Sequence, residues 1–315
     1  MIIVTGAAGF IGSNLAERLL KRGEEVVGID VLDNYYDVSI KKNNLERLKS
    51  YKKFRFIKKN AGNLDKKILK NSEIIYHEAG IGGVRYSIKN PGKYFKLNTL
   101  STFNLLVRCL DTNIKKLVFA SSSSVYGNYP EEMLPLKENY ECKPISPYGC
   151  SKLTAEEYCM SFYKVYGLPT ISLRYFTVYG PRQRPDEAIC KFSNKILNNK
   201  TIEIYGDGKQ TRDFTYIKDV IEGTILSGGS KVKGEIFNIG SGKRISVLDL
   251  IKVIEKKIGK KADMKFIEWQ KGDTTHTCAD ISKVMELLGY EPQYTIERGV
   301  KEYILWLKNK ITTCI

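Results

Sequence analysis

The sequence predicts an α/β fold, with a doubly wound parallel sheet in the first half of the chain and a smaller α/β domain in the second half. Short apolar runs of strand length alternate with segments of helical periodicity up to about residue 174. Such runs are typical of parallel strands that helices cover on both faces. After residue 174 the pattern becomes irregular and rich in Gly, Pro and charge, which indicates a separate, smaller unit.

The expected strands and helices alternate along the first half. The apolar runs predict strands at residues 2–5, 25–30, 54–58, 74–77, 116–120 and 170–173. Apolar residues at helical spacing predict helices near residues 11–21, 45–51, 94–111 and 148–166, and a short amphipathic helix at 300–308. We therefore expect a first domain over residues 1–174, joined by a return segment near 215–240, and a second domain over residues 175–315.

The composition indicates a globular protein of the cytoplasm. No apolar run approaches the ~20 residues that a membrane-spanning helix needs, and the N-terminal segment lacks the basic region of a signal peptide. Seven cysteines without a CxxC pair indicate free thiols in a reducing compartment. The two histidines, His77 and His276, are too few for a typical metal site or a histidine-based triad. We therefore expect no membrane association and no metal.

The net charge of +16 raises the question of a nucleic-acid partner. Between Lys41 and Lys70 there are twelve Lys and Arg residues against two acidic ones. The aromatic residues of this stretch, Tyr51, Phe54 and Phe56, also fit a helix end and a strand. We interpret the stretch as a lysine-rich solvated face that can concentrate an anionic substrate, and we expect no nucleic-acid binding.

A glycine-rich turn follows the first expected strand and opens the first helix. Gly6 permits the tight turn, Gly9 lets the backbone approach a pyrophosphate, and Gly12 lets the helix pack closely on the strand. The helix N-terminus then faces the phosphate charge. Asp30 ends the second strand, where a carboxylate accepts hydrogen bonds from ribose hydroxyls and repels a 2′-phosphate. This pattern predicts a Rossmann-type domain that binds NAD rather than NADP.

Tyr148 and Lys152 stand four residues apart, on one face of an expected helix. A phenol has a pKa near ~10 and is a poor base at neutral pH. A nearby lysine cation and an oxidised nicotinamide both favour the phenolate, so we expect them to lower the pKa of Tyr148. A second YxxxK match, from Tyr205 to Lys209, contains two glycines that disfavour a helix, and we treat it as a chance match.

A run of four serines, residues 121–124, follows the strand expected at 116–120. In an open parallel sheet, ligands bind at the carboxyl ends of the strands. A serine hydroxyl at this place can share a hydrogen bond with Tyr148 and with a reacting hydroxyl of the substrate. A polar surface loop is the alternative, and the place of the run between this strand and the Tyr148 helix favours the active site.

The chain resembles the extended short-chain dehydrogenase/reductase family, and within it the nucleotide-sugar epimerases and dehydratases. The resemblance runs nearly end to end, which makes it far more specific than any single motif. It is carried by TGAAGFIGS at the start, HEAGIGGVRYS at 77–87, SSSSVYG at 121–127, SPYGCSK at 146–152, RYFTVYGPRQRPD at 174–186, GDGKQTRDFTYIKDV at 206–220 and GDTTHTCAD at 272–280.

The resemblance implies a role for each residue of the site. Tyr148 is the catalytic base, and Lys152 binds the nicotinamide ribose and tunes Tyr148. Ser122 is the partner hydroxyl, because it lies four residues before Tyr126, where relatives carry their catalytic Ser or Thr. The further residues expected beside NAD are Gly6, Gly9, Phe10, Ile11, Gly12, Asp30, Asn60, Ala61, His77, Ala79, Gly80 and Asn98.

Two positions depart from the family pattern. Relatives usually have Asp near Asn60, where it contacts adenine, and Asn still offers a carbonyl acceptor there. The residue at position 78 is usually small or uncharged, whereas this chain has Glu78. We expect a salt-bridged structural role for Glu78.

The family's shared first step gives a 4-keto sugar, and nearby residues decide how this intermediate reacts further. In the 4,6-dehydratases an Asp-Glu pair directly follows the catalytic Thr, and the uronate decarboxylases keep a Glu two residues after the Ser or Thr. Ser123 and Ser124 stand at these positions and cannot perform carboxylate chemistry. The resemblance therefore implies an isomerase that catalyses 4-epimerisation. A reductase, dehydratase or decarboxylase of the same family, and a non-catalytic NAD-binding regulator, are the alternatives.

Among the epimerases, the chain is most similar to those acting on UDP-glucuronate and UDP-glucose. Thr177 stands where most epimerases of neutral sugars have Asn, and the runs at 34–37 and 83–87 resemble the uronate enzymes. We expect UDP-glucuronate as the substrate, with UDP-glucose or UDP-N-acetylglucosamine as the alternative. The residues expected to contact the UDP-sugar are Arg85, Ser123, Ser124, Thr177, Arg184, Lys191, Tyr205, Arg212 and Asp273. The last two match residues that hold the UDP phosphates and ribose.

The resemblance also implies an assembly and a cellular role. The assembly is a homodimer in which the helices near 94–111 and 148–166 pack as a four-helix bundle. Phe103, Leu106 and Leu110 supply an apolar stripe at helical spacing for this interface. The alternative is that the stripe faces the chain's own sheet. The expected cellular role is cell-surface polysaccharide biosynthesis.

Overall fold

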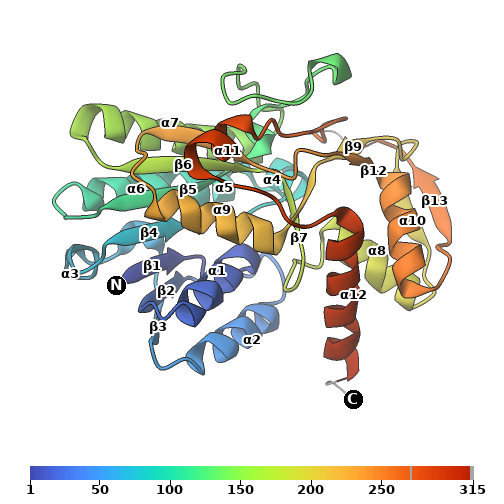
Figure 1. Cartoon of the computed structure of the whole chain (residues 1–315), viewed down its shortest axis with the longest axis horizontal. Helices are drawn as coiled ribbons and strands as arrows, with labels where there is room; N and C mark the ends of the chain where they lie inside the picture. The colour runs from blue at the N-terminus through green and yellow to red at the C-terminus, as the bar shows by residue number, and fades with distance from the viewer. Residues whose placement is uncertain (270–271, 313–315) are drawn as a thin grey trace.

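The computed structural model describes residues 1–269 and 272–312. Its centre is a parallel sheet of seven strands in the order β11-β6-β5-β4-β1-β2-β3 (Figure 1). All six strands expected from the apolar runs are present, and the serine run extends the fifth of them as far as Ser122. The strands of this sheet are β1 (Ile2–Thr5), β2 (Val26–Asp30), β3 (Phe54–Lys58), β4 (Ile74–His77), β5 (Lys116–Ser122), β6 (Thr170–Tyr175) and β11 (Glu235–Ile239).

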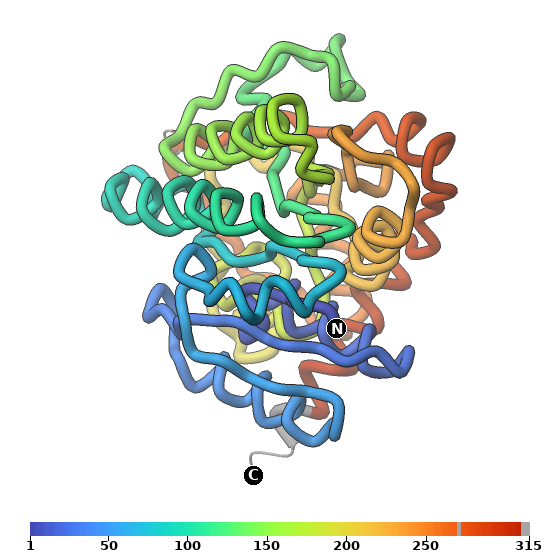
Figure 2. The backbone as a smooth tube through the Cα atoms, turned by 90° about the vertical axis from the view of Figure 1, so that its left-hand side faces the viewer, coloured from blue at the N-terminus to red at the C-terminus, as the bar shows by residue number. Residues whose placement is uncertain are grey.

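Helices cover both faces of the sheet, as the doubly wound class requires. Side chains alternate along β1, so Ile2 and Val4 pack in one apolar core with α1 and α9, while Ile3 packs in a second core with α6 and α7. The helices α6 and α7 lie against each other on that second face (Figure 2). The predicted fold class is therefore confirmed. The helices beside the sheet are α1 (Phe10–Lys21), α2 (Val38–Lys49), α6 (Ser101–Cys109), α7 (Pro147–Tyr166) and α9 (Ile217–Gly229).

Three of the expected helices differ from the structure in their limits, and the one expected at 300–308 is longer and spans Ile296–Thr312. The helix expected at 45–51 is α2, which begins at Val38 because the Asp37 carboxylate caps it, accepting from the Ser39 N–H at 2.8 Å. The segment 94–111, expected as one helix, is divided into α5 (Pro91–Tyr94), a π-helical segment (Phe95–Leu100) and α6. The apolar periodicity of a sequence window does not reveal one widened turn.

The π-helical segment has a local structural role. It brings Asn98 and Thr99 against α7, where the Asn98 amide donates to Ser151 Oγ at 3.0 Å and the Thr99 hydroxyl donates to the Ser151 carbonyl at 3.0 Å. Both contacts lie one residue before Lys152. The widened turn therefore ties this segment to the part of α7 that carries the predicted catalytic residues.

The second half of the chain contributes both to the sheet and to a separate group of elements. Within the range 215–240, α9 packs on the sheet and β11 pairs in parallel with β6. The separate group lies to one side of the sheet in Figure 1, where β8 pairs with β13 and α10 packs between α8 and α12. Among the described helices, none combines the length and apolarity needed to cross a membrane. The elements of this group are α8 (Ala188–Leu197), β8 (Ile202–Tyr205), α10 (Val247–Ile258), β13 (Met264–Ile267) and α12 (Ile296–Thr312).

The remaining elements are short, and sequence periodicity did not reveal them. Strands of two or three residues and helices of one or two turns span too few residues to show a period. They are α3 (Lys66–Lys70), α4 (Val84–Lys89), β7 (Thr177–Tyr179), β9 (Thr211–Arg212), β10 (Phe214–Tyr216), β12 (Ile245–Ser246) and α11 (Ser282–Leu288).

Candidate active site

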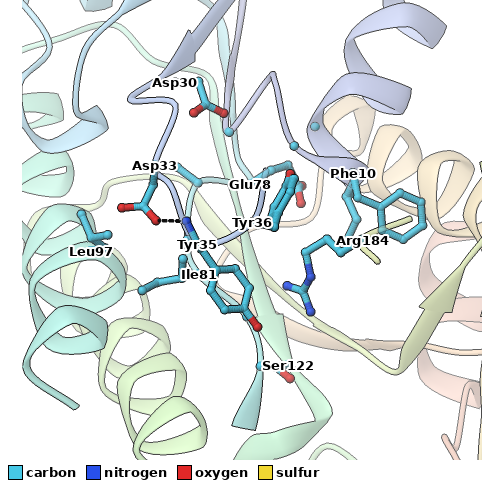
Figure 3. A pocket seen from close by; sticks show the side chains of 18 of the residues that line it. Phe10, Asp30, Asp33, Tyr35, Tyr36, Glu78, Ile81, Leu97, Ser122 and Arg184 are labelled. Carbon is cyan, nitrogen blue, oxygen red and sulfur yellow. Dashed lines mark hydrogen bonds between the residues drawn. The ribbon is translucent and has the colours of Figure 1, made fainter. Parts of the chain in front are cut away.

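A cavity of about 360 Å³ lies along the carboxyl ends of the central strands. In Figure 3, Asp30 lies at one end of this cavity and Ser122 at the other. The cavity also reaches Tyr148, Thr177 and Arg184. It thus joins the residues expected to hold a dinucleotide with those expected to react. The predicted cofactor residues in its lining are Gly6, Gly9, Phe10, Ile11, Gly12, Asp30, Asn60, Ala61, Ala79 and Gly80.

The glycine turn is built to accept a diphosphate at close range. Gly6 has a φ of +68°, and a Cβ there would lie 2.9 Å from the backbone of residues 78 and 79. A Cβ on Gly12 would lie 2.2 Å from the Gly6 carbonyl oxygen. Gly9 forms the N-cap of α1 without a side-chain hydrogen bond, so the first amides of this helix keep their donors for a ligand. These features fit the phosphates of a dinucleotide.

Asp30 and Asn60 lie where the adenosine half of NAD is expected. Asp30 is 8% exposed, and its two carboxylate oxygens accept from the backbone N–H groups of Ala8 at 3.1 Å and Leu32 at 2.7 Å. These bonds fix the carboxylate at the cavity edge and leave further lone pairs for ribose hydroxyls. The side-chain oxygen of Asn60, Oδ1, already accepts a hydrogen bond within its own loop, from the Gly62 N–H at 2.8 Å.

His77 and Asn98 lie behind the cavity lining rather than in it, and their place beside the cofactor stays a prediction. His77 is fully buried, and its ring nitrogens lie 2.7 Å from the Thr5 hydroxyl and 2.9 Å from the Thr102 hydroxyl. Burial lowers the pKa of His77 to about 3, so the ring is neutral. The Asn98 side chain binds both backbone groups of Ile81, at 2.8 and 3.0 Å. Both residues position the segment that lines the cavity.

The catalytic pair assembles where β5 ends and α7 begins. Ser146 caps α7 by accepting from the Gly149 N–H at 3.1 Å, which places Tyr148 in the first turn. The Ser122 hydroxyl, at the end of β5, faces the Tyr148 phenol and offers it a hydrogen bond that acts to lower its pKa. Burial raises the pKa of Tyr148, while this hydrogen bond and the Arg184 charge act in the opposite direction. The predicted Ser–Tyr pair is therefore present in geometry.

Lys152 points away from Tyr148 in this structure, and its predicted action on Tyr148 and on the nicotinamide ribose stays a prediction. Its ammonium donates to the Ala120 carbonyl at 2.7 Å, and the charge that favours the Tyr148 phenolate comes from Arg184. Burial lowers the pKa of Lys152 to about 8. Its Nζ would lie 3.1 Å from a Cβ on Gly80, so the lysine lies directly behind the cavity lining. Four-residue spacing predicts a shared helix face but not where a flexible side chain ends.

Arg184 enters the cavity from a loop that is fixed to the cofactor helix. Asn14 on α1 donates to the Pro181 carbonyl at 3.1 Å, and Arg182 forms a buried ion pair with Glu17 on the same helix. The Arg184 guanidinium pairs with Glu187 at 2.8 Å. In Figure 3 it points toward the centre of the cavity. This loop therefore holds the Arg184 guanidinium in the site, where the Glu187 carboxylate neutralises part of its charge.

Tyr35 and Tyr36 line the cavity, although no role beyond a family likeness was predicted for them. The Tyr35 hydroxyl donates to Asp186 at 2.9 Å, and its ring lies 4.7 Å from that of Tyr86. The aromatic pair directly beyond the second strand, near Asp30, was the signal that could have placed them. They connect the cofactor side of the cavity with the Arg184 loop.

A second pocket of about 120 Å³ adjoins the first, and Thr177 lines both. Ser123, Ser124, Arg212 and Asp273 also line it, as expected for the UDP-sugar. Arg212 is held in place by the backbone carbonyls of residues 274 and 275, at 2.5 and 3.0 Å. The structure thus places Arg212 and several hydroxyls beside the Ser122–Tyr148 pair.

The remaining predicted substrate residues form a cluster beside the second pocket. The Arg85 guanidinium lies 3.9 Å above the centre of the Tyr205 ring and pairs with Asp273 at 2.9 Å. Lys191 Nζ lies 5.9 Å from the same ring. The second YxxxK match is not helical, because glycines 206 and 208 have φ values of +64° and +75°. Lys209 is 81% exposed and away from the cavity, in agreement with a chance match.

Comparison with known proteins places this geometry in a family. Residues 2–240 match the model of the NAD dependent epimerase/dehydratase family. A UDP-glucuronate 4-epimerase of Thermodesulfobacterium geofontis is 43% identical over 98% of this chain and 96% of its own length. An uncharacterized UDP-glucose epimerase of Bacillus subtilis is 42% identical over 98% of both chains.

Solved structures agree in fold over the whole length. The Bacillus cereus UDP-glucuronic acid 4-epimerase in complex with UDP-glucuronic acid and NAD superposes with a TM-score of 0.94 at 40% identity, covering 98% of this chain and 99% of that one. A UDP-N-acetylglucosamine 4-epimerase of Methanobrevibacter ruminantium gives a TM-score of 0.90 at 34% identity, with 98% of each chain covered.

Proposed function

The chain belongs to the NAD-dependent epimerase/dehydratase family, and we propose that it is a UDP-glucuronate 4-epimerase. One observation carries the proposal. The Ser122–Tyr148 pair stands between a cavity shaped for a dinucleotide and a pocket lined by hydroxyls and a cation. Such a pair can remove and return the proton of a sugar hydroxyl.

The chain's own residues hold the cofactor and move the proton. NAD held in this cavity would supply the hydride acceptor, and later the hydride donor, for C4′ of the sugar. The glycine turn and Asp30 would hold its phosphates and adenosine ribose. Tyr148, as the phenolate, takes the proton of the C4′ hydroxyl, and C4′ becomes a carbonyl. After the keto sugar rotates, Tyr148 gives the proton back to the carbonyl oxygen, while the hydrogen on C4′ is restored to the opposite face.

The residues around the sugar position favour epimerisation over elimination or decarboxylation. Ser123 and Ser124, which follow Ser122, offer hydroxyls where those reactions need a carboxylate. In the described lining of the second pocket the one carboxylate is Asp273, which is paired with Arg85. The described residues of this pocket thus offer no free carboxylate for elimination or decarboxylation, which favours reduction of the 4-keto sugar from the other face.

The same pocket supports an acidic sugar as the substrate. The hydroxyls of Ser123, Ser124 and Thr177 can all donate to a carboxylate at C6′. Arg212 adds a positive charge beside them. The names of relatives at 43% and 40% identity agree with this assignment. UDP-glucose and UDP-N-acetylglucosamine are the alternatives, since epimerases with those names are also similar.

A panel of UDP-sugars tests the proposal. The purified protein is incubated with UDP-glucuronate, UDP-glucose and UDP-N-acetylglucosamine, and products are identified by NMR. We expect UDP-galacturonate from UDP-glucuronate with little UDP-pentose, because the site holds the carboxylate away from the orientation that favours loss of CO2. Faster turnover of either neutral sugar would exclude the uronate assignment and leave the epimerase assignment standing.

We also propose a role for each of the two domains, an oligomeric state and a cellular location for the protein. Residues 1–174, with the return segment near 215–240, hold NAD, and residues 175–315 cover the UDP-sugar.

We propose a homodimer through α6 and α7, on which Val107 is 42% and Tyr158 is 39% exposed. Leu106 is fully buried against the chain's own sheet, so this member of the expected stripe was wrongly assigned. The enzyme would act on cytoplasmic sugar nucleotides that feed cell-surface polysaccharide.

A further inference from the structure

Glu78 places a carboxyl group in the wall of the cofactor cavity. It directly follows β4, and its Oε1 accepts a hydrogen bond from the Tyr175 hydroxyl at 3.0 Å. Its other oxygen, Oε2, is buried and has no hydrogen-bond partner among the described residues. The salt bridge that we expected for Glu78 is not formed, since no cation among the described residues lies within ion-pair distance.

A buried carboxylate with one free oxygen is costly unless a further partner is present. Burial disfavours the ionised form of Glu78 and raises the pKa of its carboxyl group to about 7. Three titratable groups face it: Lys152 from α7, Tyr175 from β6 and Tyr76 from β4. The Lys152 charge favours the ionised carboxylate, but its ammonium is bound to the Ala120 carbonyl. Glu78 also lines the cavity, so a positive charge held there would favour its ionised form across a short distance.

The layout of the cavity indicates which part of NAD meets Glu78. Asp30 marks the adenosine end, and the Ser122–Tyr148 pair marks the end where the sugar must meet the nicotinamide. In Figure 3, Glu78 lies between Asp30 and Ser122. Tyr175, which donates to Glu78, pairs in register with Ser122, and Lys152, whose charge acts on Glu78, is on the same helix as Tyr148. Glu78 is thus closer to the nicotinamide half than to the adenine.

We propose that Glu78 is a counter-charge for the oxidised nicotinamide, and that it stabilises bound NAD+ relative to bound NADH. The oxidised ring carries a positive charge that is lost on reduction, so a carboxylate nearby favours the oxidised form alone. An epimerase must begin each cycle with NAD+, and a cofactor left reduced after loss of a keto intermediate is inactive. Glu78 therefore favours the state from which turnover starts. This inference rests on the proposed function only for the position of the nicotinamide.

The test is a redox titration of the purified holoenzyme and its Glu78→Gln variant. Each protein is equilibrated without oxygen against mediator dyes, and reduced nicotinamide is read by its near-ultraviolet absorbance. Gln is isosteric and can still accept from Tyr175 through its carbonyl oxygen. We expect Glu78→Gln to make the bound cofactor about tenfold easier to reduce, which is about +30 mV in midpoint potential for a two-electron couple.

The pH dependence separates a charge effect from a packing effect. Bound NAD+ would lower the pKa of Glu78 below its value of about 7 in the empty cavity, so only well below that range is Glu78 protonated in both cofactor states and the two proteins should have the same potential. Above about pH 8 Glu78 is charged, and the full difference should appear. Lys152 and the tyrosines are present in both proteins, so their own titrations largely cancel in the comparison. A difference that is equal at all pH values would overturn the proposal.

A matched control and a second measurement keep the test decisive. Glu138→Gln removes another half-buried carboxyl with a raised pKa, outside the cofactor cavity, and should leave the potential unchanged. If Glu78→Gln loses its cofactor on purification, calorimetric titrations with NAD+ and with NADH replace the redox titration. The ratio of the two affinities then reports the same preference as the midpoint potential. No change in that ratio overturns the proposal. No sugar is used, so a failure here is distinct from a failure of the uronate assignment.

Discussion

Replacing Ser122 with Ala tests how the active site controls the acidity of its base. Ser122 Oγ accepts from the Ser124 N–H at 3.1 Å, so its own proton is free to be donated to the Tyr148 oxygen. This bond favours the phenolate and opposes the burial that raises the pKa of Tyr148. A hydrogen bond to a charged group contributes about 1.5–3 kcal/mol. We therefore expect kcat at neutral pH to fall by about 10- to 100-fold.

The assay is kcat measured against pH with UDP-glucuronate. The phenolate is the active form, so loss of the Ser122 donor raises the pKa of Tyr148 and moves the acidic limb of the profile to higher pH. Above the pKa values of both proteins the two rates should converge. A deficit that is equal at every pH would refute the reasoning, because it would mean that the hydroxyl only positions the substrate.

The serine run supplies its own control for this experiment. Ser121 lies next to Ser122 in the cavity wall, but its buried hydroxyl has no hydrogen-bond partner among the described residues. Ser121→Ala should therefore leave the profile unchanged. Ser122→Thr keeps the hydroxyl and should restore most of the activity. Failure of Thr to restore it would point to a packing defect at the end of β5.

Three further changes test the cofactor and substrate sites. Gly12→Ala places a methyl group 2.2 Å from the Gly6 carbonyl oxygen, and it should lower the free energy of unfolding by about 1–3 kcal/mol and cause loss of bound NAD. Gly229→Ala, where the added methyl group meets open space, should have no such effect in thermal melts and cofactor assays. Asp30→Ala should weaken NAD binding by about 10- to 100-fold in calorimetry, and an unchanged affinity would show that this carboxylate is not on the ribose. Thr177→Asn should lower the kcat/KM ratio of UDP-glucuronate to UDP-glucose by about tenfold, and an unchanged ratio would remove Thr177 from substrate selection.

The sequence predicted most of the sheet and the cofactor turn because both depend on local rules. A buried parallel strand must be apolar along its length, so β1 and β4 could be located to the residue. Glycine at positions 6 and 12 is required by contacts of 2.2 to 2.9 Å with nearby backbone. The pattern also placed the serine run beside Tyr148, because each stands at the end of an element that meets the same edge of the sheet, and the choice of Ser122 within the run came from the family resemblance.

Features that depend on distant contacts could not be predicted in this way. The Lys152 side chain ends on the Ala120 carbonyl, a contact between residues 32 positions apart. His77 is enclosed by hydroxyls from β1 and α6, which no pattern around residue 77 reveals. Glu78 was expected to form a salt bridge, yet its partner is Tyr175, 97 residues away. Each depends on which side chains the finished fold brings together.

The position of β11 has a consequence for the order in which the chain can fold. Every residue of β6 is buried, and β11 covers its outer edge. While the protein is being synthesised, that edge stays open until residues 235–239 have left the ribosome. An unpaired apolar strand of this kind is a site for aggregation. We therefore expect a nascent chain that ends after β6 to need chaperone protection. The elements α8 and β8 lie between β6 and β11 in the chain and are thus inserted within the sheet's own sequence, whereas α10, β13 and α12 follow it.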